Sequence, residues 1–191
     1  MKNAIILHGG PSKQEYYDPN MPSMSNAHWI PWLQAQLLKN DIPTATPEVP
    51  KSYDRNWAVW NTEIERYDVT PETILIGHST GAGFFVKYLS INPELKVDRV
   101  ILIAPWLDPD NEKTVDFFDD FEIDSELIKR TMGITIWYSD DDENSVLKTI
   151  QILKNKIPDA EFKEFHGFGH FCIDDLKSEK FPELLDEILS R

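Results

Sequence analysis

Short apolar runs separated by helix-like stretches constrain the fold of this chain more than any other feature. Five runs rich in aliphatic and β-branched residues span residues 4–7, 73–76, 99–103, 134–138 and, with more polar members, 161–165. Continuous apolar runs of this length are typical of parallel strands that are buried on both faces. A sixth, weak strand is expected around residues 44–49, where prolines interrupt it.

Between these runs, apolar residues recur at the three- and four-residue spacing of a helix face. The expected helices cover residues 29–37, 57–64, 84–91, 147–153 and 181–189, and Asp54 is a candidate N-cap of the second. Strands that alternate with helices predict an α/β fold. We expect a doubly wound, mostly parallel sheet of about six strands with helices on both faces, and a ligand site at the carboxyl ends of the strands.

Length and charge limit the organisation and the partners. The 191 residues contain no linker-like segment, so we expect a single domain over residues 1–191. A net charge of −14 disfavours nucleic acid and anionic membrane surfaces as partners. The single cysteine excludes an intramolecular disulfide, and the apolar stretch near the start is too short for a signal peptide or a membrane span. The expected location is the cytoplasm.

The densest acidic run lies between residues 116 and 126, where phenylalanines interrupt it. This mixture predicts an amphipathic surface insertion instead of a disordered tail. The run lacks the alternating ligands and the glycine of an EF-hand calcium loop, so no metal is expected.

The pentapeptide Gly77-His78-Ser79-Thr80-Gly81 directly follows the expected strand 73–76. It matches the nucleophile elbow, in which a strand turns abruptly into a helix and presents a serine on a strained backbone. Glycines two residues before and after the serine relieve the crowding of such a turn. The pattern nominates Ser79 as a catalytic nucleophile.

A serine nucleophile needs a histidine to accept its proton and a carboxylate to orient that histidine. After Ser79, residues 140–143 supply four carboxylates at the end of the strand 134–138, and His166 and His170 follow the strand 161–165. The order serine, acid, histidine is that of α/β-hydrolases, and all three groups fall at strand ends. Together they predict acyl-transfer chemistry.

Six segments spread over essentially the whole chain carry a resemblance to a known family. They are Ile5 through Gly9, His28 through Leu33, Trp57 with Trp60, Gly77 through Gly81, Ser139 through Asp142, and Gly169 through Phe171. On these segments the chain resembles the small serine hydrolases typified by retinoblastoma-binding protein 9 and its bacterial relatives, which implies a compact α/β-hydrolase fold. The Leu-x-Cys-x-Glu motif of the namesake's retinoblastoma interaction is absent, so that partner is not carried over and protein partners stay unknown.

The resemblance implies that Asp142 is the catalytic acid and His170 the base. The family often has proline after the acid, where this chain has Glu143, and Asp140 adds a carboxylate before the Asp-Asp pair. Asp141 therefore stays the alternative acid, with Asp140 a solvated charge. His166 is the alternative base, and it, His28 and His78 are otherwise expected to be packing or surface histidines.

Other predicted site residues surround the nucleophile. Backbone N–H groups of Gly10, or alternatively Gly9, and of Thr80 are expected to form the oxyanion hole. The long loop of residues 9–25 is expected to be functional. An apolar substrate pocket is expected from Trp106, Phe117, Phe118 and Phe121, with core packing as the alternative, whereas Cys172 is expected to be a buried small hydrophobe.

These residues predict a serine hydrolase that cleaves small-molecule carboxylic esters through an acyl-enzyme intermediate and needs no cofactor. The same triad also supports an amidase, a peptidase or an acyltransferase. A binding protein with a silent site on the same fold is a further alternative.

Overall fold

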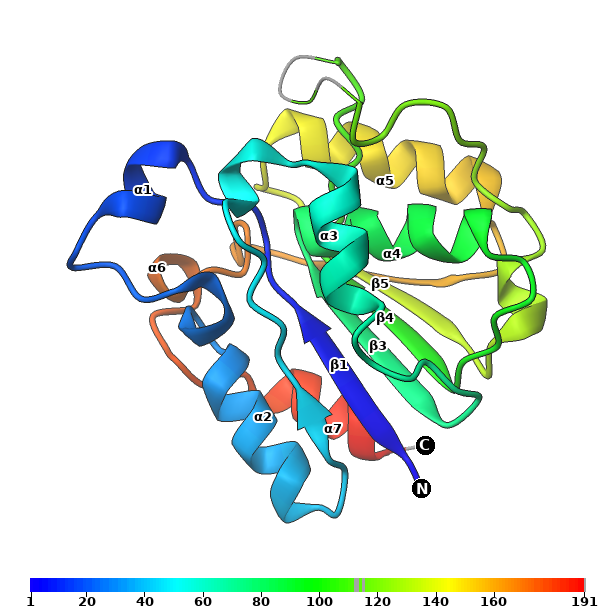
Figure 1. Ribbon diagram of the computed structural model, residues 1–191, viewed down its shortest axis with the longest axis horizontal. Coiled ribbons are helices and arrows are strands. Elements are labelled where there is room, and N and C mark those ends of the chain that lie inside the picture. The colour runs from blue at the N-terminus through cyan, green and yellow to red at the C-terminus, as the bar shows by residue number, and fades with distance from the viewer. Residues whose placement is uncertain (112–113, 115, 191) are drawn as a thin grey trace.

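The computed structural model describes residues 1–111, 114 and 116–190. Six strands in this part of the chain form one parallel sheet in the order β2-β1-β3-β4-β5-β6 (Figure 1). They are β1 (Asn3–Leu7), β2 (Thr44–Ala45), β3 (Thr73–His78), β4 (Arg99–Ile103), β5 (Ile134–Ser139) and β6 (Glu161–Phe165). The sheet confirms the predicted fold class.

Helices cover both faces of this sheet. The α-helices are α1 (Lys13–Tyr17), α2 (Ile30–Lys39), α3 (Trp57–Ile64), α4 (Thr80–Ile91), α5 (Asn144–Lys156), α6 (Ile173–Leu176) and α7 (Pro182–Leu189). Single turns of 3-10 helix occur at η1 (Met24–Asn26), η2 (Ser52–Asp54) and η3 (Leu127–Arg130). In Figure 1, α3, α4 and α5 lie on one face of the sheet, and α2 and α7 lie together on the other.

Two local predictions need correction. Asp54 does not cap α3, because it belongs to η2; the cap is Asn56, whose side-chain Oδ1 accepts a hydrogen bond from Val59 N at 3.2 Å. Strand β2 is much shorter than residues 44–49. Pro43 and Pro47 flank it and lack the N–H that a strand ladder requires.

Burial follows the hydrophobic pattern of the strands. Every residue of β3, β4 and β5 is buried, as expected for central strands covered by helices on both faces. Strand β6 lies at the edge of the sheet, and all its residues are partly or fully exposed. This edge position explains why its sequence is the most polar of the five runs.

The order of the strands determines where a ligand can bind. Strand β1 pairs with β2 on one side and with β3 on the other. The connections after β1 and after β2 therefore run in opposite directions along the sheet. A crevice forms at such a switch point, outside the carboxyl ends of the two central strands. The loop after β1 and the turn after β3 meet there.

The turn after β3 consists of one residue. Ser79 has φ 54° and ψ −119°, a conformation that costs an L-residue about 1–3 kcal/mol. Its N–H donates to the carbonyl of Ile103 at 2.9 Å, and its carbonyl accepts from Trp106 N at 3.2 Å. A Cβ on Gly77 would lie 2.5 Å from Ala82 Cα, and one on Gly81 would lie 2.4 Å from the carbonyl oxygen of His8. Both glycines are therefore required by close backbone packing.

The acidic run docks on α4 through its aromatic residues. Phe117 is fully buried against Trp60, with ring centroids 5.3 Å apart, while Asp116 and Asp120 are exposed. Lys87 Nζ donates to the carbonyls of Phe117 and Asp119 at 3.0 and 2.8 Å. The run is thus amphipathic, as predicted, because its rings pack on the protein while four of its six carboxylates, those of Asp116, Asp120, Glu122 and Glu126, are exposed.

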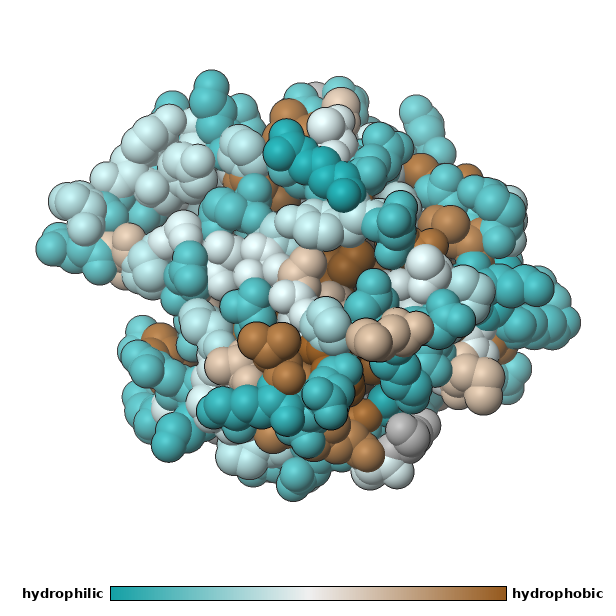
Figure 2. Space-filling model, turned by 60° about the horizontal axis from the view of Figure 1, so that its bottom comes forward, coloured by the Kyte–Doolittle hydropathy of each residue, from teal (hydrophilic) through white to brown (hydrophobic). Residues whose placement is uncertain are grey.

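Hydrophilic side chains cover most of the face in Figure 2, with smaller hydrophobic patches between them. Among the described helices, none has the length and apolar character needed to cross a bilayer.

The elbow glycines make a prediction about stability. Gly77→Ala is expected to lower the free energy of unfolding by about 3 kcal/mol or more, because the new methyl group would collide with the backbone of α4. Gly167→Ala is the control: Gly167 has φ +73° but open space, so only about 1 kcal/mol should be lost. Urea denaturation measures both values, and equal losses would contradict the packing account.

Candidate active site

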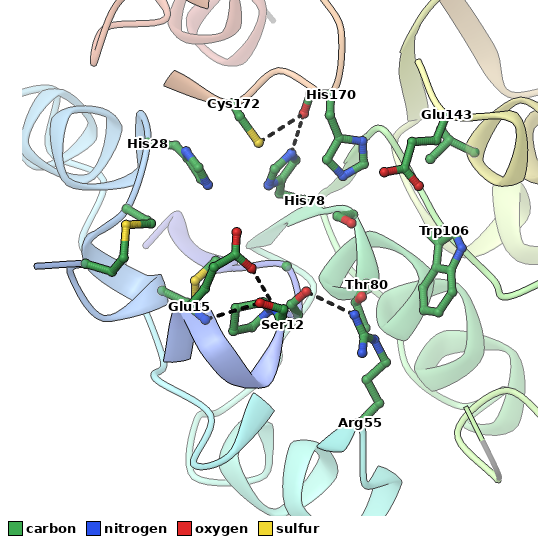
Figure 3. Close-up of a pocket in the computed structure, with 18 residues that line it drawn as sticks. Ser12, Glu15, His28, Arg55, His78, Thr80, Trp106, Glu143, His170 and Cys172 are labelled. Atoms are coloured by element: carbon green, nitrogen blue, oxygen red, sulfur yellow. Dashed lines mark hydrogen bonds between the residues drawn. The ribbon is translucent and has the colours of Figure 1, made fainter. Parts of the chain in front are cut away.

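A cavity of about 640 Å³ opens at the predicted place, outside the carboxyl ends of the strands (Figure 3). Elements that are far apart in the sequence contribute to it. Its wall includes Gly9 and Gly10 after β1, Ser79 and Thr80 after β3, and His170 after β6. The cavity therefore brings together the predicted nucleophile, the predicted base and both predicted oxyanion loops.

The two oxyanion loops touch beside Ser79. A Cβ on Gly9 would lie 3.0 Å from Ser79 Cβ, and a Cβ on Gly10 would lie 3.2 Å from Thr80 Oγ1. Thr80 is the first residue of α4, where the N–H groups have no acceptor within the helix and carry partial positive charge. The arrangement suits an anion that develops on an oxygen of a group bonded to Ser79 Oγ.

His170 is held by a buried carboxylate. Its Nδ1 lies 2.9 and 3.1 Å from the two carboxylate oxygens of Asp142, whose side chain is 0% exposed, whereas that of His170 is 28% exposed. A carboxylate only accepts, so Nδ1 carries the hydrogen and Nε2 keeps its lone pair. This pairing gives the histidine the tautomer that a general base needs.

The alternative acid and base lie elsewhere. Asp141 is exposed and accepts hydrogen bonds from Ser139 Oγ at 2.5 Å and from Gly169 N at 3.0 Å, so it ties the loop after β5 to the loop that carries His170. His166 is exposed and bonds Asp140 at 2.8 Å. Neither Asp141 nor His166 belongs to the described lining of the cavity.

A second histidine positions the first. His78 is buried, and its Nε2–H donates to the carbonyl of His170 at 2.8 Å. Burial, together with the neighbouring His170 and His28, holds the pKa of His78 well below its ordinary value. Burial likewise lowers the pKa of His28. Both imidazoles therefore stay neutral near pH 7 and do not oppose a proton on His170.

The structure separates the four aromatic residues that were predicted to line a substrate pocket. Trp106 lines the cavity, but Phe117, Phe118 and Phe121 are absent from its described lining. These three rings pack around α4 and the loop after β4 instead, which is the core-packing alternative.

The predicted functional loop of residues 9–25 does contribute to the wall. Its apolar members there include Met21 and Met24. Sequence reasoning missed polar residues of the wall, among them Arg55, because they lie in loops without a recognisable motif. Glu15 also lines the cavity, and its pKa is lowered by hydrogen bonds from Ser12.

Residues that could hold a metal lie outside this cavity. Asp140, Glu164 and His166 bring one ligand atom each to within 4.8 Å of one another, but all three are exposed. Exposed acidic groups often gather in this way without an ion, and the group contains none of the residues around Ser79.

Cys172 lines the cavity, which invites comparison with a thiol nucleophile. Burial raises the pKa of its thiol to about 12, and nearby carboxylates such as Asp175 act in the same direction. Because only the thiolate reacts, we expect iodoacetamide to alkylate Cys172 at pH 8 at least about 100-fold more slowly in the folded protein than in urea. Equal rates in the two states would show that the thiol is not protected.

Solved structures share this fold over nearly their full lengths. The product of the ydeN gene of B. subtilis superposes with a TM-score of 0.79 at 22% identity, covering 100% of this chain and 98% of that one. A YdeN-like protein of Pectobacterium atrosepticum gives 0.63 at 19% identity, with coverage of 98% and 89%. Est1E of Butyrivibrio proteoclasticus, solved with ferulic acid bound, gives 0.63 at 16% identity, with coverage of 100% and 88%.

Sequence comparison identifies the family directly. No curated protein matched the chain. The family model described as serine hydrolase matches residues 19–187, a range that contains the elbow, the acid loop and the histidine loop. This match covers most of the chain and shows that the chain belongs to the serine hydrolase family, and its six-stranded parallel sheet is the fold that it shares with the solved structures.

Proposed function

We propose that this protein hydrolyses carboxylic esters through an acyl-enzyme, with Ser79 as nucleophile, His170 as general base and acid, and Asp142 as the group that orients His170. One observation carries the proposal. His170 is bonded through Nδ1 to the buried carboxylate of Asp142, in the same cavity into which the strained elbow brings Ser79.

In the first half of the reaction, Ser79 Oγ attacks the acyl carbon of the ester. His170 Nε2 takes the hydroxyl proton, and the resulting imidazolium is stabilised by Asp142. The carbonyl oxygen becomes an oxyanion, for which the N–H groups of Gly10 and Thr80 are the proposed donors. When the tetrahedral intermediate collapses, His170 returns the proton to the departing alcohol and the acyl group stays on Ser79.

In the second half, His170 removes a proton from a water molecule, whose oxygen attacks the acyl carbon. The second tetrahedral intermediate uses the same donors. Its collapse transfers the proton from His170 to Ser79 Oγ and releases the carboxylic acid. Every group that moves a proton or stabilises charge in this scheme comes from the chain itself.

Small-molecule esters fit the cavity better than polymers. Its volume of about 640 Å³ lies in the range of pockets for small ligands, and Met21, Met24 and Trp106 give it apolar walls. Two proteins of similar fold point to the same class: Est1E was solved with ferulic acid, and RhEst1 from Rhodococcus is described as an esterase. We further propose a cytoplasmic location, since one cysteine allows no internal disulfide.

Single removal of the nucleophile or the base tests the proposal. Ser79→Ala and His170→Ala should each lower turnover of p-nitrophenyl esters by about 10⁶-fold, because the triad acts as a unit. The wild type should be measured on esters from acetate upward beside aminoacyl anilides. Turnover retained by both variants would refute the assignment, and faster cleavage of the anilides would favour the amidase alternative.

The acid is tested by a matched pair of substitutions. Asp142→Asn should lower kcat by about 10⁴-fold, since an amide no longer selects the Nδ1–H tautomer of His170. Asp141→Asn is the matched comparison and should lower kcat by less than about tenfold, because its amide oxygen can still accept from Gly169 N and the bond between Asp142 and His170 is kept. A larger loss for Asp141→Asn than for Asp142→Asn would move the acid by one position.

A further inference from the structure

Arg55 is a half-buried cation in the wall of the cavity, and the proposed mechanism gives it no role. It lies between η2 and α3 with φ 46°, and its guanidinium extends toward Thr80 and Trp106 (Figure 3). Among the described lining residues it is the only lysine or arginine. In a chain with a net charge of −14, a cation at this position calls for an explanation.

The contacts of Arg55 lead to the loop after β1. Nη2 donates to the carbonyl of Gly10 at 3.0 Å, and Nη1 donates to the carbonyl of Tyr53 at 3.1 Å. The guanidinium carbon lies 5.2 Å from the ring centroid of Trp106, within the range of a cation–π contact. The side chain thus bridges the oxyanion loop and the opposite wall of the cavity.

This bridge restrains a loop segment that is flexible by its composition. Gly9 and Gly10 are consecutive glycines, which have the greatest backbone freedom and do not hold a fixed orientation alone. Side chains fix both of their carbonyls: His8 Nδ1 bonds that of Gly9 at 2.7 Å, and Arg55 bonds that of Gly10. Among the described residues, no acceptor takes the N–H groups of Gly9 and Gly10, which leaves them available to a ligand.

The guanidinium also lies close to Gly10 and Thr80, the two residues whose N–H groups are the proposed oxyanion donors. A Cβ on Gly10 would be 3.2 Å from Arg55 Nε and equally far from Thr80 Oγ1. Within the described part of the chain, Nε is buried without a hydrogen-bond partner and no carboxylate pairs with the guanidinium within 4 Å. Burial lowers the pKa of Arg55 and Asp108 opposes this, but a guanidinium stays charged.

We propose that Arg55 is a positioning residue of the oxyanion hole: by binding the carbonyl of Gly10 it anchors the peptide that directly follows the proposed donor, while His8 holds the carbonyl of the Gly9–Gly10 peptide that carries this N–H, and Arg55 places positive charge beside the developing oxyanion. This inference rests on the proposed esterase function. Such a device acts on the transition state and not on the bound substrate, so it changes kcat and leaves KM nearly unchanged.

The test compares Arg55→Met, which removes the charge but keeps an unbranched side chain, with Arg55→Lys, which keeps the charge but lacks the planar guanidinium that binds the Gly10 carbonyl. With p-nitrophenyl acetate, Arg55→Met should lower kcat by about 10- to 100-fold and keep KM within about threefold of the wild-type value. Arg55→Lys should lower kcat by a smaller factor. Ki for a boronic acid, which mimics the tetrahedral intermediate, should rise by the factor by which kcat/KM falls. Lys13→Met, an exposed substitution against the ring of Tyr53, is the control and should change neither constant.

A carboxylate-bearing ester, mono-p-nitrophenyl succinate, separates positioning from substrate recognition. Equal losses of kcat on the neutral and the anionic ester support the inference. A loss confined to KM for the anionic ester, or an unchanged kcat for Arg55→Met beside an active wild type, would overturn it. Lack of Ser79-dependent turnover in the wild type would refute the proposed function, and the inference with it. Thermal denaturation of each variant verifies that it is folded.

Discussion

The strained backbone at Ser79 is the constraint on which the rest of the site depends. An L-residue with φ 54° and ψ −119° persists only where its surroundings hold it, and here they do so from several sides. Strand β4 accepts the N–H of Ser79, the loop after β4 binds its carbonyl, and the glycines on either side allow α4 to approach β1 and β3. The buried centre of the sheet thereby presents one hydroxyl to the cavity and places the N–H of Thr80, at the first position of α4, beside it.

The electrostatics around His170 follow from burial. Asp142 is withdrawn from solvent, so its negative charge acts on His170 with little screening. His78 and His28 fill the other side of the imidazole but are kept neutral, which removes two potential positive charges from its neighbourhood. The exposed acids nearby have structural tasks, since Asp141 and Asp175 both bond backbone N–H groups of the histidine loop. Asp142 thus bonds the imidazole itself, whereas Asp141 and Asp175 hold the loop that carries it.

The sequence predicted most of what depends on local pattern. Continuous apolar runs indicated the buried strands, and the spacing of Gly77, Ser79 and Gly81 indicated the elbow. The choice of Asp142 over Asp141 came from a family resemblance, because neighbouring loop carboxylates look alike until the fold buries one of them. Tertiary packing decided what pattern could not: Phe117 entered the core instead of the pocket. The contact of Arg55 with Gly10 joins residues 45 positions apart, and no sequence pattern in either loop indicates it.

If the fold makes the hydroxyl of Ser79 a nucleophile, this hydroxyl should react with a fluorophosphonate. The mass of the intact protein after this treatment, followed by mapping of the modified peptide, measures the reaction. The account predicts one adduct per chain on Ser79 in the folded wild type, and none in the urea-unfolded protein, where the serine has lost His170. An unmodified folded protein, or an adduct on another residue, would contradict the account.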